Sequence, residues 1–270
     1  MRREFIPSLP KRERDTHKGD YGKALIVAGS VGLGGAALLC AKACARSGAG
    51  LTALAVPEEL ITAAVISCPE VMSFPRTLDA VMERLDWASV CAIGPGLGRT
   101  PEARKLVAEL IRNSKIPLII DADGINALAE RIYLLDKADA PVVLTPHEGE
   151  FRRLAPDYSG SREERATRFA REHNCIMLLK GNGTVIAFPN GDFIVNTTGN
   201  PGMAKGGSGD VLTGVIAALT AQLPLDSAVQ TAAYLHGLAG DIAAAELGEY
   251  SMMPSDIIGK LPEAFKQITL

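Results

Sequence analysis

The sequence predicts an α/β fold with a central, mainly parallel sheet and antiparallel strands at one edge. Three observations support this class. Short apolar runs alternate with helix-length segments, which is the rhythm of strands joined by helical crossovers. Most of these runs are apolar throughout, as expected of strands covered on both faces. Late in the chain, short loops rich in Gly and Asn separate the apolar runs, a pattern typical of antiparallel hairpins. Together they indicate three layers, α/β/α.

The apolar runs place the strands. We expect parallel strands at 24–29, 51–56, 90–94, 117–121 and 141–145. Three further runs are expected as antiparallel edge strands, at 175–180, 184–189 and 192–196. Between the last two, Asn190-Gly191 is a two-residue hairpin signal.

Helices are expected where apolar residues recur at spacings of three and four. These segments are 34–47, 101–113, 161–173, 209–221, 224–246 and 255–267. Thr100-Pro101 fits an N-cap followed by Pro in the first turn, and Ser161 with Glu164 fits a capping box. No linker, internal repeat or low-complexity tract interrupts the pattern, so we expect one domain over 1–270.

Composition excludes several function classes. The 270 residues are 47% hydrophobic and 22% charged with a net charge of −3, so no overall field favours nucleic acid or an anionic membrane. The charged run 162–172 is expected to be a solvated helix face rather than a nucleic-acid patch. The segment 1–14 lacks an apolar signal core, and no apolar run reaches the roughly 18 residues that span a bilayer. We therefore expect a cytoplasmic protein with no membrane or nucleic-acid partner.

The five cysteines show no CxxC pair of the zinc-binding kind. Cys40 and Cys44 are four apart on an expected helix, which leaves a metal or redox pair open as an alternative. Their alanine- and leucine-rich surroundings favour small, reduced core residues.

Glycine or polar residues follow nearly every expected strand. The loops are 28–35, 94–98, 121–126, 145–150 and 180–184. In open α/β sheets, ligands bind beyond the carboxyl ends of the strands, so these loops should gather along one rim. None has the glycine spacing of a dinucleotide fingerprint or a Walker loop, which argues against a Rossmann dehydrogenase and a P-loop NTPase.

The segment 196–219 carries the strongest functional signal. Gly206, Gly207, Ser208 and Gly209 precede an apolar helical run, so free backbone N–H groups and the positive helix end should form an anion pocket. Asp210 then falls in the first helical turn, where its carboxylate can act as a base toward a substrate hydroxyl. In the alternative interpretation, Asp210 only stabilises the helix start and the glycines only allow close helix packing.

Six motifs, in order, resemble one family. The GSGD string is similar to the anion-hole and base motif of the ribokinase-like superfamily, and the whole set resembles NAD(P)H-hydrate dehydratases, which repair hydrated nicotinamide cofactors. The motifs are HKGDYGKALIVAGSVGLGGAALL (17–39), GPGLGR (94–99), DADGINAL (121–128), LTPHEGEFRRL (144–154), LLKGNGTVI (178–186) and NPGMAKGGSGDVLTG (200–214). The resemblance covers roughly residues 17–260 and implies a ribokinase-like fold without the epimerase domain to which many relatives are fused.

The resemblance also implies a site. The hydrated cofactor would lie against Ala36, Gly96, Gly98 and His147, with Asp210 at its hydroxyl-bearing carbon. The donor nucleotide would lie against Lys180, Gly181, Asn182, Gly183 and Thr184, with Gly209 at its phosphates. Lys205 stands where many relatives carry threonine, a change beside the anion loop that could alter donor affinity.

The family further implies phosphorylation of the ring hydroxyl by ADP or ATP with Mg²⁺, followed by loss of phosphate. It also implies a homotetramer that can work beside a separate epimerase. Two other functions stay open: a ribokinase-like kinase of a vitamin-precursor alcohol, and a silent nucleotide-binding regulatory protein.

Other polar residues have weaker signals. His147 follows an expected strand and can either contact a ligand or bond the neighbouring backbone, and the loop position favours a ligand. His17, His173 and His236 have no partner pattern and are expected to be structural or solvated. Asp121, Asp123 and Asn126 could ligate a metal, but Asp and Asn also cap helices in such positions. The sequence does not identify the Mg²⁺ ligands.

Overall fold

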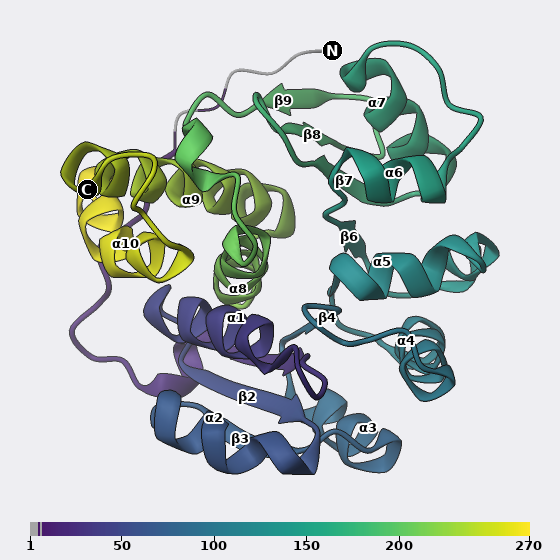
Figure 1. Cartoon of the computed structure of the whole chain (residues 1–270), viewed down its shortest axis with the longest axis horizontal. Helices are drawn as coiled ribbons and strands as arrows, with labels where there is room; N and C mark the ends of the chain where they lie inside the picture. Colours follow the sequence, from purple (N-terminus) through teal and green to yellow (C-terminus); the bar gives the residue numbers. More distant parts are fainter. Residues whose placement is uncertain (1–4, 6) are drawn as a thin grey trace.

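The computed structural model describes residues 5 and 7–270, in which one nine-stranded sheet lies between two layers of helices (Figure 1). The strands are β1 (Lys23–Val27), β2 (Leu51–Val56), β3 (Met72–Pro75), β4 (Val90–Ile93), β5 (Leu118–Ile120), β6 (Val142–Leu144), β7 (Ile176–Leu179), β8 (Val185–Ala187) and β9 (Phe193–Val195). Their order is β3-β2-β1-β4-β5-β6-β7-β8-β9. Pairs from β3 to β7 are parallel, whereas β8 and β9 are antiparallel. The expected mainly parallel sheet with antiparallel edge strands is confirmed. The expected strand at 175–180 differs in one respect, because β7 runs parallel to β6, so only β8 and β9 are added in the antiparallel sense.

The helices divide between the two faces of this sheet. One face is covered by α1 (Gly34–Arg46), α2 (Ile61–Ser67), α8 (Ser208–Thr220), α9 (Leu225–Leu247) and α10 (Pro254–Ile268). The other is covered by α3 (Leu78–Trp87), α4 (Pro101–Asn113), α5 (Ala122–Ala129), α6 (Glu148–Leu154) and α7 (Arg162–Glu172). None of these helices is both long enough and apolar enough to cross a membrane.

Strand β1 shows why both layers are needed. Ala24 and Ile26 belong to the core under α1, α8 and α9, while Leu25 and Val27 belong to the core under the opposite helices. All four side chains are fully buried. Because successive side chains point to opposite faces, a strand that is apolar throughout requires a covered sheet on both sides.

The chain changes direction at β1. It runs outward through β2 and β3, then returns to place β4 on the other side of β1. The loops after β1 and β4 are therefore neighbours, and the Gly29 amide donates to the Pro95 carbonyl at 2.8 Å. A crevice at such a switch point is where open α/β sheets bind ligands.

Most expected boundaries hold, including both caps. The Thr100 hydroxyl accepts from the Ala103 amide at 3.2 Å, and Ser161 forms its capping box with Glu164. Strand β3 and the helices α2, α3, α5 and α6 were not expected from the sequence. Strand β3 lies at the sheet edge and ends in Pro, so it has neither the buried run nor the alternation that marks a strand.

The hairpin between β8 and β9 forms, but its turn differs from the expected two-residue turn. The Phe188 amide donates to the Asp192 carbonyl, and the Gly191 amide donates back to the Phe188 carbonyl. The loop is thus Pro189-Asn190-Gly191, with Gly191 at φ +87°. Pro189 ahead of the Asn-Gly pair favours this longer loop, with Gly in the left-handed position.

All five cysteines are buried and free. Helix α1 packs so closely on α8 that a Cβ at Gly214 would lie 2.1 Å from the Cys40 carbonyl oxygen. The Thr52 hydroxyl donates to the Cys44 sulfur at 3.6 Å. Burial raises the pKa of the Cys44 thiol to about 12, so it stays protonated.

We predict that replacing Cys40 and Cys44 with Ala leaves turnover unchanged. Each loss of a sulfur atom should lower the free energy of unfolding by on the order of 1 kcal/mol, with Cys44 the larger effect because Thr52 loses its acceptor. Denaturant unfolding and a turnover assay check both parts. Lost turnover in a variant that still folds would contradict a purely structural role.

Candidate functional site

The glycine-rich loop leads directly into helix α8, which begins at Ser208. Gly207 is the N-cap residue at φ +104°, a left-handed conformation that favours glycine. A Cβ at this position would also lie 2.7 Å from the Leu39 side chain. The first amides of a helix have no acceptor inside it, and here they open onto a cavity of about 800 Å³. The helix start therefore offers donors to an anion.

This cavity gathers most of the expected nucleotide and base residues. Its lining includes Lys180, Gly181, Asn182, Gly183 and Thr184 after β7, and Gly207, Ser208, Gly209 and Asp210 at α8. His147 also lines it, whereas Gly206 precedes the lining residues of the helix start. The 180–184 segment and the α8 start thus face one another across one space.

Asp210 lies in the first turn of α8, beside this cavity. Burial, and to a lesser extent the negative charge of Asp121, raise the pKa of its carboxyl to about 7, while the positive charge of Lys180 opposes the shift. A carboxylate with this pKa is both ionised and basic near neutral pH, which is what a general base requires.

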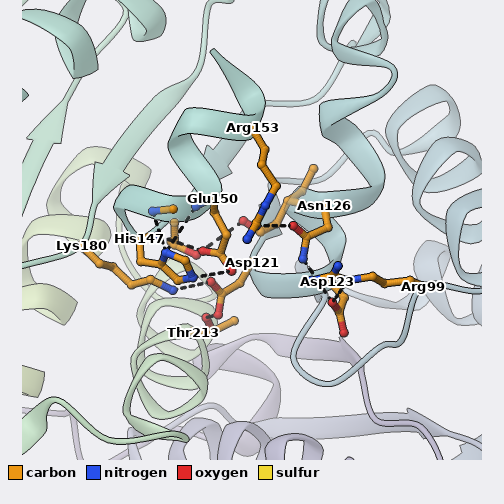
Figure 2. Close-up of polar contacts among 12 residues, drawn as sticks. Arg99, Asp121, Asp123, Asn126, His147, Glu150, Arg153, Lys180 and Thr213 are labelled. Atoms are coloured by element: carbon orange, nitrogen blue, oxygen red, sulfur yellow. Dashed lines mark hydrogen bonds and ion pairs between the residues drawn. The ribbon is translucent and has the colours of Figure 1, made fainter. Parts of the chain in front are cut away.

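An ion pair between Lys180 and Asp121 lines the same cavity as Asp210. The Lys180 ammonium donates to Asp121 at 2.7 Å, and the Thr213 hydroxyl donates to the other Asp121 oxygen, also at 2.7 Å (Figure 2). Asp121 is 1% exposed. Burial alone would lower the pKa of Lys180, but Asp121 and Glu150 outweigh it, so its pKa lies above the ordinary value and the ammonium stays charged.

Gly209 lets this ammonium approach the helix start. A Cβ at Gly209 would lie 3.1 Å from the Lys180 Nζ, tighter than ordinary contact. The fixed positive charge and the α8 amides therefore adjoin the same point in the cavity. Such a combination suits the phosphates of a nucleotide.

His147 is the N-cap of α6. Its Nδ1 accepts from the amides of Gly149 at 2.9 Å and Glu150 at 3.3 Å, and Glu150 accepts from the His147 amide at 2.9 Å. Because Nδ1 is an acceptor, the neutral ring carries its proton on Nε2. The capping interpretation is confirmed. The Nε2 lies 3.4 Å from Glu150 Oε1 and the side chain is 55% exposed, and contact with a ligand stays a prediction.

Ala36, Gly96 and Gly98 lie at the adjoining part of the rim rather than in the lining of this cavity. Gly96 packs against the α1 start, where a Cβ would lie 3.0 Å from the Ala36 methyl group and 2.6 Å from the Leu33 carbonyl oxygen. The Gly98 amide donates to Asp123 at 3.0 Å. The 94–98 loop is thus pinned between α1 and α5.

Three arginines that hold the loops and helices around the site were not expected from the sequence. Arg76 donates to the Gly29 and Leu97 carbonyls and ties the loops after β1 and β4 together. Arg162 donates to the carbonyls of Leu179, Asn182 and Gly183, so it holds the 180–184 loop. The 162–172 face was expected to be solvated, and this prediction is wrong for two of its arginines, which turn inward. Arg162 binds the loop, and Arg165 binds Glu148 at 2.6 Å.

His236 was expected to be structural or solvated, but it is 8% exposed and lines the cavity. Its Nε2 has no hydrogen-bond partner among the described residues. Burial lowers its pKa to about 4, so the ring is neutral. No local sequence signal marks it, because its place in the cavity comes from the packing of α9.

The other polar candidates are bound by protein groups, although Lys205 also lines the cavity. Lys205 turns its ammonium to the carbonyls of Tyr250 and Met252, at 2.7 and 2.6 Å. Asp123 binds Gly98, Arg99 and Asn126. No group of three acidic, His or Cys side chains suited to a metal occurs in residues 5 and 7–270. The described residues therefore do not form a protein-only metal cage.

The fold has three layers, with the sheet between two layers of helices. A helix with a glycine N-cap and an aspartate of raised pKa lie at the sheet rim, and this combination is typical of ribokinase-like proteins. A ribokinase-like superfamily protein from Enterococcus faecalis superposes with a TM-score of 0.88 at 30% identity, covering 97% of this chain and 93% of that one. The family model described as NAD(P)H-hydrate dehydratase matches residues 24–263. The chain belongs to the NAD(P)H-hydrate dehydratase family.

Individual relatives agree with this assignment. The chain is 38% identical to the ADP-dependent (S)-NAD(P)H-hydrate dehydratase of Bacillus subtilis, over 96% of this chain and 95% of that protein. The crystal structure of the ADP/ATP-dependent dehydratase from Bacillus subtilis, grown with ATP and Mg²⁺, superposes with a TM-score of 0.86. A bifunctional NAD(P)H-hydrate repair enzyme of Moorella thermoacetica is 45% identical, but the chain covers only 52% of it. The chain thus spans about half the length of several curated relatives.

Proposed function

We propose that this protein dehydrates hydrated NADH and NADPH back to NAD(P)H, with ADP or ATP as the phosphoryl donor. The observation that carries the proposal is the position of Asp210, whose pKa is raised to about 7 in the cavity that holds the α8 start. Identity of 38% to a dehydratase of matching length supports it. A cavity of about 800 Å³ falls within the usual range for small-molecule sites.

The donor nucleotide would lie against the segment Lys180–Thr184, with its phosphates at the loop formed by Gly206, Gly207, Ser208 and Gly209. The free amides of the helix start and the Lys180 ammonium would stabilise charge on the transferring phosphoryl group. The hydrated ring would lie against Ala36, Gly96, Gly98 and His147. His147 can donate from Nε2, because its Nδ1 is already occupied by the helix cap.

Water is a poor leaving group, which explains the need for a donor. Asp210 takes the proton of the ring hydroxyl. The hydroxyl oxygen attacks the terminal phosphorus of the donor, and AMP leaves from ADP or ADP leaves from ATP. The carbon–oxygen bond then breaks, phosphate departs with that electron pair, and a proton lost from the neighbouring carbon restores the ring double bond. Atoms balance as hydrated cofactor plus donor giving NAD(P)H, phosphate and the shortened nucleotide.

Mg²⁺ is proposed to accompany the nucleotide. Both oxygens of Asp121 accept from protein donors, Lys180 and Thr213, so the ion would be held chiefly by the donor's phosphates, as is common for Mg²⁺. When bound, it would neutralise phosphate charge.

We further propose a cytoplasmic homotetramer that works beside a separate epimerase. Five free, buried cysteines suit a reducing compartment. Exposed apolar side chains at Val65, Ile66 and Met72 suit a subunit interface. A molecular mass of 28.5 kDa from sedimentation equilibrium, the mass of one chain, would rule out the tetramer.

We predict that ADP supports the reaction at least as well as ATP. The measurement is recovery of the reduced-cofactor absorbance from hydrated NADH with Mg²⁺ and each nucleotide in parallel. Activity with ATP and none with ADP would overturn the donor assignment. Accumulation of a phosphoester without recovered absorbance would instead identify a small-molecule kinase, and absence of any nucleotide-dependent change would identify a silent binding protein.

Asp210→Asn should lower turnover by roughly 10²–10⁴-fold, the usual effect of losing a positioned general base. Asparagine keeps the size of the side chain and removes a negative charge near the phosphates, so nucleotide affinity should be equal or slightly higher. Paired turnover and calorimetric binding measurements on both proteins check this.

The control for Asp210→Asn is thermal stability at pH 8. The pKa of Asp210 is higher in the folded protein than in the unfolded chain, so its ionised form destabilises the fold at pH 8. Asparagine carries no charge, and the variant should therefore melt no lower than wild type. Near-normal turnover would exclude Asp210 as the base. Lost nucleotide binding together with a lower melting temperature would show that the residue is structural.

A further inference from the structure

A second cavity lies beside the site, between α4, α5 and α6. Its volume is about 380 Å³. Its charged lining consists of four arginines and two acids: Arg99, Arg104, Arg152, Arg153, Asp123 and Glu130. The chain as a whole carries a net charge of −3, so this arginine pocket is a local reversal of sign. The mechanism proposed above uses none of its arginines.

Two of the guanidinium groups have carboxylate partners within the pocket. Arg99 binds Asp123 at 3.3 Å, and Arg104 binds Glu130 at 3.2 Å. These pairs are partly exposed, and their side chains can shift toward a ligand at small free-energy expense.

The other two are less well neutralised. Arg152 lies 3.6 Å from Glu148, but that carboxylate already binds both terminal nitrogens of Arg165, at 2.6 and 3.2 Å. Among the described residues, the polar partner of Arg153 is the neutral side-chain carbonyl of Asn126, at 2.7 Å. Neighbouring guanidinium groups without carboxylates of their own are the arrangement that binds phosphate oxygens.

Hydrogen bonds connect the arginine pocket to the substrate rim. Asp123 accepts from the Gly98 amide through one oxygen and from Asn126 through the other, and Asn126 accepts from Arg153. Figure 2 shows Arg153 directed toward Asn126 and Arg99 directed toward Asp123. The 94–98 loop and the arginine pocket are therefore neighbours, joined through Asp123.

We propose that the arginine pocket binds a phosphate group of the hydrated dinucleotide substrate. This inference rests on the proposed function, which places the hydrated ring at Gly96 and Gly98. The rest of the dinucleotide must then leave the site along the rim, and its phosphates are the only anions it carries. The donor's phosphates are accounted for at the α8 start, so the pocket serves the substrate. The bound group is either the bridging pyrophosphate, shared by both substrates, or the 2′-phosphate, which only the NADPH form carries.

The test uses Arg153→Gln and the double variant Arg152→Gln/Arg153→Gln. Both side chains lie at the surface, so the fold should survive. The matched control is Arg112→Gln, on α4 but outside the pocket and paired with Glu109 at 2.9 Å. The KM is measured for hydrated NADH and hydrated NADPH separately. We expect the double variant to raise KM roughly tenfold or more with kcat little changed, and the control to leave KM unaltered.

The two substrates distinguish the two phosphates. A rise in KM for hydrated NADPH alone places the 2′-phosphate in the pocket, whereas equal rises place the pyrophosphate there. Unchanged KM values for both substrates would overturn the proposal. Calorimetric binding of hydrated NADPH without nucleotide separates this test from the proposed function. Weakened binding in the variant supports the pocket even if wild type shows no turnover, and equal or absent binding in both proteins refutes it.

Discussion

The Asp121–Lys180 ion pair joins the parts of the site that come from distant segments. Asp121 follows β5 directly, Lys180 follows β7 directly, and Thr213 brings α8 onto the same carboxylate. Removing charges from water is expensive, and a buried pair is tolerated only when good geometry and further hydrogen bonds satisfy both partners. The two 2.7 Å contacts to Asp121 meet this condition. Loss of either partner would leave a buried charge at the centre of the sheet rim.

The same pair sets the chemistry of Asp210. Burial and the charge of Asp121 make the ionised form less favourable, and the Lys180 ammonium limits the shift. Their balance gives a carboxylate whose pKa of about 7 matches neutral conditions. Lys180 also adjoins the amides at the α8 start through Gly209, so one group both tunes the base and complements phosphate charge. The structural network and the proposed catalytic one are therefore not separable.

Local patterns in the sequence predicted the local features. The apolar runs gave the sheet, because strands covered on both faces need them, and the Gly206–Asp210 segment gave the helix start with its carboxylate. The KGNGT loop at 180–184 and His147 were expected from the family resemblance, and both line the cavity of Asp210. Their roles there are proposals that the variants above examine.

The features that sequence missed are non-local. The partner of Lys180 lies 59 residues away and that of Thr213 lies 92 away, so no spacing rule connects them. Arg162 looked like part of a solvated charged run, and its turn toward the 180–184 loop depends on how α7 packs beside β7. Strand β3 was missed because edge strands lack the full burial that gives a recognisable pattern.

The pH dependence of kcat/KM tests the account most directly. If Asp210 must be ionised to accept the hydroxyl proton, the rate should fall about tenfold per pH unit below pH 7, as the carboxyl with a pKa of about 7 becomes protonated. Above that value the rate should level off. A profile that stays flat down to pH 5 would mean that the essential base has an ordinary carboxyl pKa of about 4, and would contradict the tuning of Asp210 by burial and by the Asp121–Lys180 pair.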